Sequence, residues 1–139
     1  ERIGDYAKGI AKINLLIGEE PLMKPIIDLP TMASKAADML DQALTAFAQQ
    51  DAAMARDIPS RDDEIDSLYE QIYRELISLI MAEPSRIEQA NYLLWVAHNL
   101  ERAADRVTNI CERVVFTATG QLTELNAEEG QRVSVDALE

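Results

Sequence analysis

The sequence predicts an all-α protein, an antiparallel three-helix bundle preceded by one further helix. Ala, Leu and Ile are abundant, and aromatic residues make up only 5% of the 139 residues, a composition that favours helix over sheet. Apolar residues recur at spacings of three and four over long stretches. Five glycines and five prolines provide little turn material for a many-stranded fold. This length fits one domain with one core.

The first helical stretch covers residues 1–18, where apolar residues keep helical spacing from Ile3 to Ile17 and Gly18 can end the helix. The chain starts inside this pattern without an initiator Met or a helix cap. We therefore expect a fragment whose upstream part is missing. Because its apolar stripe would lack native neighbours, we expect this helix to fold back on the bundle or to dock on a second copy of the chain.

Three prolines mark residues 19–30 as a connecting loop, with Asp28 or Leu29 directly before the next helix and a proline in the first turn of that helix. That second helix carries a clear apolar stripe. Asp51 can cap a further helix, and Pro59 should divide a short helix from a longer one.

The longer helix should end before Pro84. Ser85 followed by Glu88 is typical of a capping box and predicts the start of the last helix. This helix has the clearest periodicity and should run to about Thr119, where a glycine follows. The tail, residues 121–139, is polar and weakly patterned, and we expect it to fray.

Charge and cysteine content restrict the function. The chain has 25 acidic and 13 basic residues and a net charge of −12, which makes nucleic acid an improbable partner. Cys111 is the only cysteine, so no intrachain disulfide can form, and we expect a buried structural thiol. No apolar run is long enough to cross a bilayer, and no signal peptide is visible. We expect a reducing, cytoplasmic compartment.

One acidic motif occurs twice. Glu1-Arg2-Ile3-Gly4-Asp5 opens the chain, and Glu101-Arg102-Ala103-Ala104-Asp105 repeats it. Each copy stacks two carboxylates one turn apart on a helix face, an arrangement that costs roughly 0.2–0.5 kcal/mol per pair. An arginine or a multivalent cation would compensate.

Further donors share a face with the second copy. At 100° per residue, four side chains fall within an arc of about 60°: His98, Glu101, Asp105 and Glu112. A column of oxygen donors with one imidazole suits hard or borderline metal ions. The alternative is a solvated acidic face balanced by neighbouring arginines.

The longer middle helix carries a similar pair, Asp62 and Asp66. Asp62 lies in register with the apolar stripe, so its carboxylate should face a neighbouring helix. Two antiparallel helices could bring both acids against Glu101 and Asp105, where they would repel unless cations lie among them. The alternative is that acids near a helix N-terminus simply interact with its dipole.

Three motifs in this order resemble the PhoU family of bacterial phosphate-signalling regulators. Residues 100–105 and 109–112 resemble the family's signature helix, residues 1–7 resemble the same signature from the preceding repeat, and residues 62–66 resemble the acidic motif of the middle helix. The resemblance covers about residues 1–122.

The resemblance implies two three-helix repeats with acidic motifs that bind clusters of iron or zinc. Residues 1–18 would end the preceding repeat, residues 19–30 would link the repeats, and residues 31–120 would form the second repeat. The implied metal ligands of the second repeat are Asp62, Asp66, Glu101 and Asp105, with His98 and Glu112 as additional candidates. Glu1 and Asp5 would belong to an incomplete first site, where Lys12 stands at the position that corresponds to Glu112.

The family's function would then be regulatory rather than enzymatic. The resemblance implies a negative regulator of phosphate uptake and phosphate-starvation signalling that acts on a phosphate ABC transporter and a sensor histidine kinase. It would be peripheral to the membrane through these partners, and we expect a homo-oligomer. The sequence itself has no Gly-rich phosphate loop and no nucleophile–base arrangement.

Three other interpretations remain open. Ala97-His98-Asn99-Leu100 is similar to a segment of histidine phosphotransfer modules, although the carboxylate of Glu101 would repel a phosphohistidine. A ferritin-like di-metal oxidase needs Glu-x-x-His on two helices, and the single histidine here stands in the reverse order. The third is a metal-free helical interaction domain.

Overall fold

The computed structural model describes residues 1–19, 21–22 and 28–125. Five α-helices and two short 3₁₀ turns occur in this order: α1 (Arg2–Ile17), α2 (Asp28–Gln49), α3 (Ala52–Asp57), η1 (Ile58–Arg61), α4 (Asp62–Ala82), η2 (Pro84–Arg86) and α5 (Ile87–Thr119). These described ranges contain no strand, and the predicted all-α class is confirmed.

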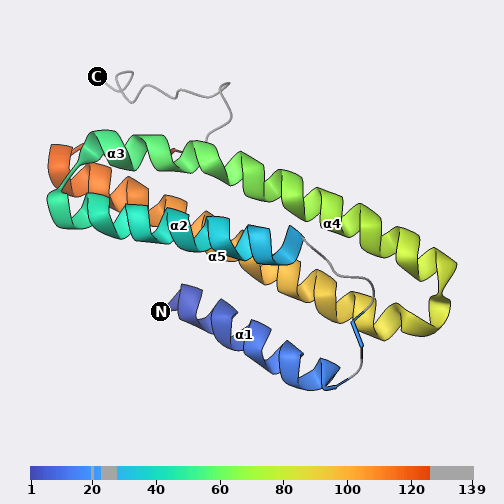
Figure 1. The fold of residues 1–139 in the computed structure, drawn as a ribbon. Coiled ribbons are helices and arrows are strands. Elements are labelled where there is room, and N and C mark those ends of the chain that lie inside the picture. The colour runs from blue at the N-terminus through green and yellow to red at the C-terminus, as the bar shows by residue number, and fades with distance from the viewer. Residues whose placement is uncertain (20, 23–27, 126–139) are drawn as a thin grey trace, which may run out of the picture.

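Three long rods form the bundle (Figure 1). The first is α2, the second is α3, η1 and α4 in line, and the third is α5, with each rod antiparallel to the one before it in the chain. Helix α1 lies along α5, antiparallel to it, on the side away from α4. Within the described residues, α1 packs on α5 alone.

The core lies between α2, α4 and α5. Its largest fully buried side chains are Met32, Met39, Ile58, Ile65, Ile72, Leu76, Val107, Val114 and Val115. Burying a side chain of this kind stabilises the fold by about 1.5–3 kcal/mol. Ala90, Ala97 and Ala104 recur every seven residues along α5 and are fully buried, so little side-chain bulk separates α5 from its neighbours.

The helix ends follow from local chemistry. Asp51 caps α3 as predicted, because its carboxylate accepts hydrogen bonds from the N–H groups of Ala53 and Met54, both at 3.0 Å. The 3₁₀ turn that contains Pro59 separates the short α3 from the long α4. Helix α5 ends at Thr119, where Gly120 adopts a left-handed conformation with φ 75°.

Two predicted boundaries are wrong. Ser85 does not cap the last helix: it lies inside the 3₁₀ turn η2, and Arg86 occupies the N-cap position without a side-chain hydrogen bond. Pro84 favours this tight turn by fixing its own φ. Helix α2 begins at Asp28, slightly earlier than predicted, whereas the predicted place of Pro30 in the first turn, where its missing N–H is not needed, is confirmed.

Helix α1 packs on its own bundle, which is one of the two arrangements expected from the sequence. It ends at Ile17, with Gly18 at φ 64°, and folds back on the bundle. Ile13 is its only buried residue, whereas Leu15 and Leu16 remain 80% and 64% exposed. Its contact with α5 is therefore formed mostly by partly buried side chains, such as Ile3 and Ile17.

The start of the tail is also attached. Residues 121–125 follow α5, and the N–H of Leu125 donates to Glu112 at 3.1 Å. Residues 126–139, most of the predicted fraying tail, lie outside the described residues. No helix in the described ranges combines the length and apolar character needed to span a bilayer.

Candidate functional site

Three of the acids predicted at the second-repeat site interact across α4 and α5. Asp66 lies near the start of α4, and Glu101 and Asp105 lie one turn apart on α5. Loss of hydration is the main cause of the raised pKa of Glu101, and the charges of Asp105 and Asp66 raise this pKa further. Loss of hydration and then the charge of Asp105 also raise the pKa of Asp66. The structure thus brings three carboxylates within electrostatic range of one another.

Glu101 is the most constrained of the three. Its Oε2 atom is buried and accepts no hydrogen bond from the described residues. Nδ1 of His98 lies 3.5 Å from this oxygen, at the limit of a hydrogen bond. The Glu101 carboxylate therefore retains capacity for a further positive partner.

The described side chains do not form a finished metal centre. Among residues 1–19, 21–22 and 28–125, no group of three or more His, Cys, Asp or Glu side chains is placed to hold a metal ion. The donors Asp66, Glu101 and Asp105 have the chemistry that hard cations prefer, and they repel one another. They would have to change side-chain conformation to converge on one ion.

His98 lies among aromatic rings rather than among acids alone. Its ring centroid is 6.3 Å from that of Tyr69 on α4 and 6.3 Å from that of Trp95 on α5. The Trp95 side chain is nevertheless 61% exposed. These contacts hold the imidazole beside Glu101 at the junction of α4 and α5.

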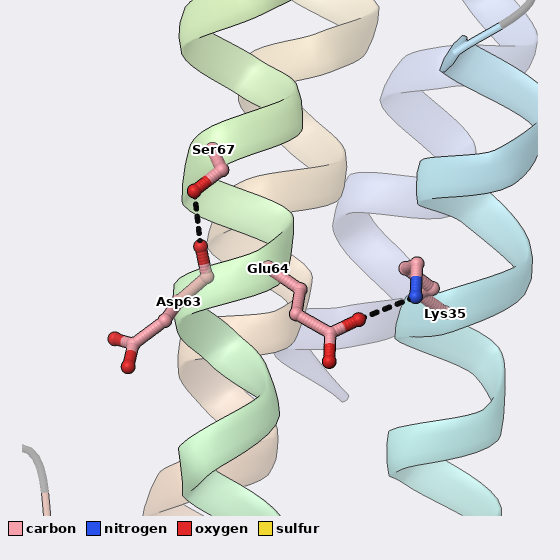
Figure 2. Close-up of polar contacts among 4 residues, drawn as sticks. All are labelled: Lys35, Asp63, Glu64 and Ser67. Atoms are coloured by element: carbon pink, nitrogen blue, oxygen red, sulfur yellow. Dashed lines mark hydrogen bonds and ion pairs between the residues drawn. The ribbon is translucent and has the colours of Figure 1, made fainter.

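The acidic side chains of residues 62–64, at the start of α4, lie in different environments. Asp62 is buried, with 7% of its surface exposed, which confirms that this position faces the bundle. Glu64 points to α2 and pairs with Lys35, while the carbonyl of Asp63 accepts a hydrogen bond from the Ser67 hydroxyl at 2.8 Å (Figure 2). The ion pair lowers the pKa of Glu64.

The remaining candidate ligands lie apart from this cluster. Glu1, the N-cap residue of α1, and Asp5 in its first turn are exposed, and Lys12 is exposed further along the same helix. Glu112 lies two turns beyond Asp105 and accepts the hydrogen bond from the Leu125 N–H. Among the candidate ligands, Asp66, Glu101 and Asp105 thus act on one another, with His98 beside Glu101.

One polar cluster was not predicted from the sequence. Tyr6 of α1 accepts a hydrogen bond from Nε of Arg102 at 3.3 Å, and interaction with Arg102 and then with Arg106 lowers the pKa of the Tyr6 hydroxyl. Aligning the two motif copies could not have shown it, because it depends on how α1 packs against α5. A Tyr on the inner face of α1 was the only available signal.

The fold and the acidic cluster define an all-α protein with carboxylates gathered between two long antiparallel helices. Residues 29–114 match the PhoU domain. The chain therefore belongs to the PhoU family. Two bacterial relatives are named phosphate-specific transport system accessory protein PhoU homolog. The one from Clostridium acetobutylicum is 33% identical over 91% of this chain and 58% of its own length. The one from Deinococcus radiodurans is 36% identical over 86% of this chain and 56% of its own length.

A solved structure agrees with these relationships. The crystal structure of the phosphate transport system regulatory protein PhoU from Streptococcus pneumoniae superposes with a TM-score of 0.81 and 35% identity. The match covers 89% of this chain and 58% of that protein. The chain thus spans slightly more than half the length of these relatives.

Proposed function

We propose that this protein acts as a regulatory accessory component of a phosphate-specific transport system. The supporting observation is the PhoU domain match, together with relatives whose names describe that role. The action is non-catalytic: it works by contact with partners from the cytoplasm.

The regulation is negative and has two targets. One is the phosphate ABC transporter, and the other is the sensor histidine kinase that activates phosphate-starvation genes. The family resemblance of the three acidic motifs supports both targets. The net charge of −12 fits a protein that meets other proteins rather than nucleic acid.

Metal binding is the structural part of the proposal. Asp66, Glu101 and Asp105 would hold a divalent or trivalent ion, iron or zinc among the candidates, with Asp62 and His98 adjacent. Loss of hydration and then mutual repulsion raise the pKa values of Asp66 and Glu101, and this supports the assignment. A bound ion would neutralise this repulsion and link α4 to α5.

The position of His98 supports this function over phosphotransfer. Its Nδ1 atom lies 3.5 Å from a carboxylate oxygen of Glu101. That carboxylate would repel a phosphoryl group on the imidazole. The corresponding test is phosphorylation of the purified chain by a phosphorelay kinase, which we expect to be absent with or without His98→Gln.

Regulation is tested in the full-length protein. Replacing both Glu101 and Asp105 by Ala should relieve the repression of phosphate-starvation genes in phosphate-rich cells. The matched control replaces Asp38 and Asp41, two exposed acids of α2 outside both proposed metal sites, and should leave repression intact. Circular dichroism and melting establish that each variant is folded. A folded, metal-free Glu101/Asp105 variant that still represses as the parent does would contradict the proposal.

A further inference from the structure

Two arginines of α5 converge on one phenol hydroxyl of α1. Nε of Arg102 donates to the Tyr6 hydroxyl at 3.3 Å, and the guanidinium carbon lies 6.0 Å from the centre of the Tyr6 ring. Arg106, one turn further along α5, interacts with the same hydroxyl. Its Nη1 atom also donates to Asn109 at 3.0 Å. Two positive groups thus share a neutral acceptor.

The two arginines have no carboxylate at ion-pair distance in the described part of the chain. The ion pairs found there are formed by Lys35, Arg74, Arg86 and His98. This is unexpected in a chain where acids outnumber bases by 25 to 13. Nε of Arg106 is in addition buried, and no described residue accepts a hydrogen bond from it. A buried donor without an acceptor is costly, so the cluster has capacity for another acceptor.

The cluster is partly exposed to solvent. Tyr6, Arg102 and Arg106 are each half-buried, which leaves a route from solvent and strengthens charge-assisted hydrogen bonds. The Tyr6 hydroxyl accepts from Arg102, and its own proton has no protein acceptor within the described ranges. The exposed Arg2 lies one turn before Tyr6 on α1 and adds positive charge nearby.

We propose that Tyr6, Arg102 and Arg106 form a binding site for a doubly charged tetrahedral oxyanion of the phosphate class. Guanidinium groups present forked N–H donors that match phosphate oxygens, and the tyrosine hydroxyl supplies a further donor. Two guanidinium charges balance one dianion. The charges of Glu101 and Asp105 also reach Arg102, so the affinity is modest.

This site uses none of the proposed metal ligands, and it does not rest on the proposed regulatory function. It uses cations on the α1 side of α5, whereas the metal cluster uses carboxylates between α4 and α5. The test is therefore made on metal-free protein in the presence of a chelator. Any phosphate that binds under these conditions does not bind through a metal ion.

The experiment titrates the purified chain with inorganic phosphate at constant ionic strength and follows binding by calorimetry and by amide NMR shifts. Chloride and acetate serve as ion controls, and phenyl phosphate as the ester probe. Arg106→Gln should weaken phosphate binding by about tenfold, the value expected for losing one charge-assisted hydrogen bond. Arg113→Gln is the matched control, because Arg113 is an exposed arginine on the same helix.

A second variant separates binding from folding. Tyr6→Phe keeps the ring that packs against Arg102 but removes the hydroxyl, and it should also weaken phosphate binding while the melting of the bundle remains close to that of the parent. Tighter binding of inorganic phosphate than of phenyl phosphate identifies free phosphate as the ligand, and the reverse identifies a phosphate ester. Equal affinity in Arg106→Gln and Arg113→Gln, or no saturable binding by the parent, overturns the proposal.

Discussion

The two copies of the Glu-Arg-x-x-Asp motif carry the same charges but lie in different surroundings. In the first copy, Glu1 and Asp5 are exposed on α1, which contacts only α5 in the described structure. In the second copy, Glu101 and Asp105 are half-buried on α5, and the charge of Asp66 on α4 acts on Glu101.

The difference shows that burial against the neighbouring helices, together with Asp66 of α4, adds to the repulsion that the motif itself creates between Glu101 and Asp105. Both copies place two carboxylates one turn apart, which alone costs only a few tenths of a kcal/mol. In the second copy, loss of hydration and a third carboxylate from α4 add to this repulsion. The predictions below test this dependence on α4.

The largest effect should come from the core that holds α4 in place. Leu76 is fully buried, so Leu76→Ala should lower the free energy of unfolding by about 2–5 kcal/mol. Leu15→Ala on α1 is the control, because Leu15 is 80% exposed and should change stability by less than about 0.5 kcal/mol. Urea unfolding of both variants makes the measurement. Similar losses in the two would mean that α1 is held as firmly as α4.

Metal ions should stabilise the folded chain only by binding to the second copy of the acidic motif. A ligand at 100 times its Kd adds about 2.7 kcal/mol to stability, and iron, zinc or manganese should raise the melting temperature accordingly. Replacing Glu101 with Gln and Asp105 with Asn should abolish this rise, whereas Glu1→Gln with Asp5→Asn should preserve it. Melting and elemental analysis are the measurements. Equal loss in both double variants would remove the distinction between the copies.

A smaller, stabilising effect is expected at the α1–α5 contact. A Cβ at Gly9 would lie 3.5 Å from the amide of Asn99, which is ordinary van der Waals contact. Gly9→Ala should therefore raise stability by about 0.5–1 kcal/mol through helix propensity. Gly4→Ala, where no atom lies within 4 Å, is the companion variant. Hydrogen exchange of α1 should slow in both, and faster exchange in Gly9→Ala alone would reveal a clash.

The smallest effect concerns pH. Glu101 and Asp66 have raised pKa values, so in the folded state they bind protons more tightly than in the unfolded chain. Their unfavourable contribution to stability is absent at low pH and appears as pH rises through these raised values. Asp105→Asn should stabilise the metal-free chain by about 0.2–0.5 kcal/mol at neutral pH and flatten this dependence. Melting curves across that range in chelator, with Asp5→Asn as control, test it; identical pH profiles for parent and Asp105→Asn would contradict it.

The sequence predicted the fold well because the helical spacing of the apolar residues and the residues that begin or end helices indicate the same elements. The apolar stripes defined the long helices, and Asp51, Pro59 and Gly120 marked real boundaries. The capping box at Ser85 was wrong because a preceding proline favours a 3₁₀ turn, a local competition that a short motif does not reveal.

The site was predicted less completely. Helical spacing placed Asp66 toward the acids of α5, and the position of Asp62 in the apolar stripe correctly predicted its burial. Spacing within one helix does not specify the rotation of a neighbouring helix, so the separation of Glu64, which pairs with Lys35 on α2, was not foreseen. The contact of Tyr6 with Arg102 likewise depends on how one helix is rotated relative to its neighbour.

The buried cysteine gives the bundle an internal reporter of opening. Cys111 is fully buried, and loss of hydration raises the pKa of its thiol to about 11. Because the thiolate is the reactive form, alkylating reagents should not modify this residue while the three rods are packed. The rate of labelling therefore measures how often the core separates around α5. No dye or engineered probe is needed to follow that motion.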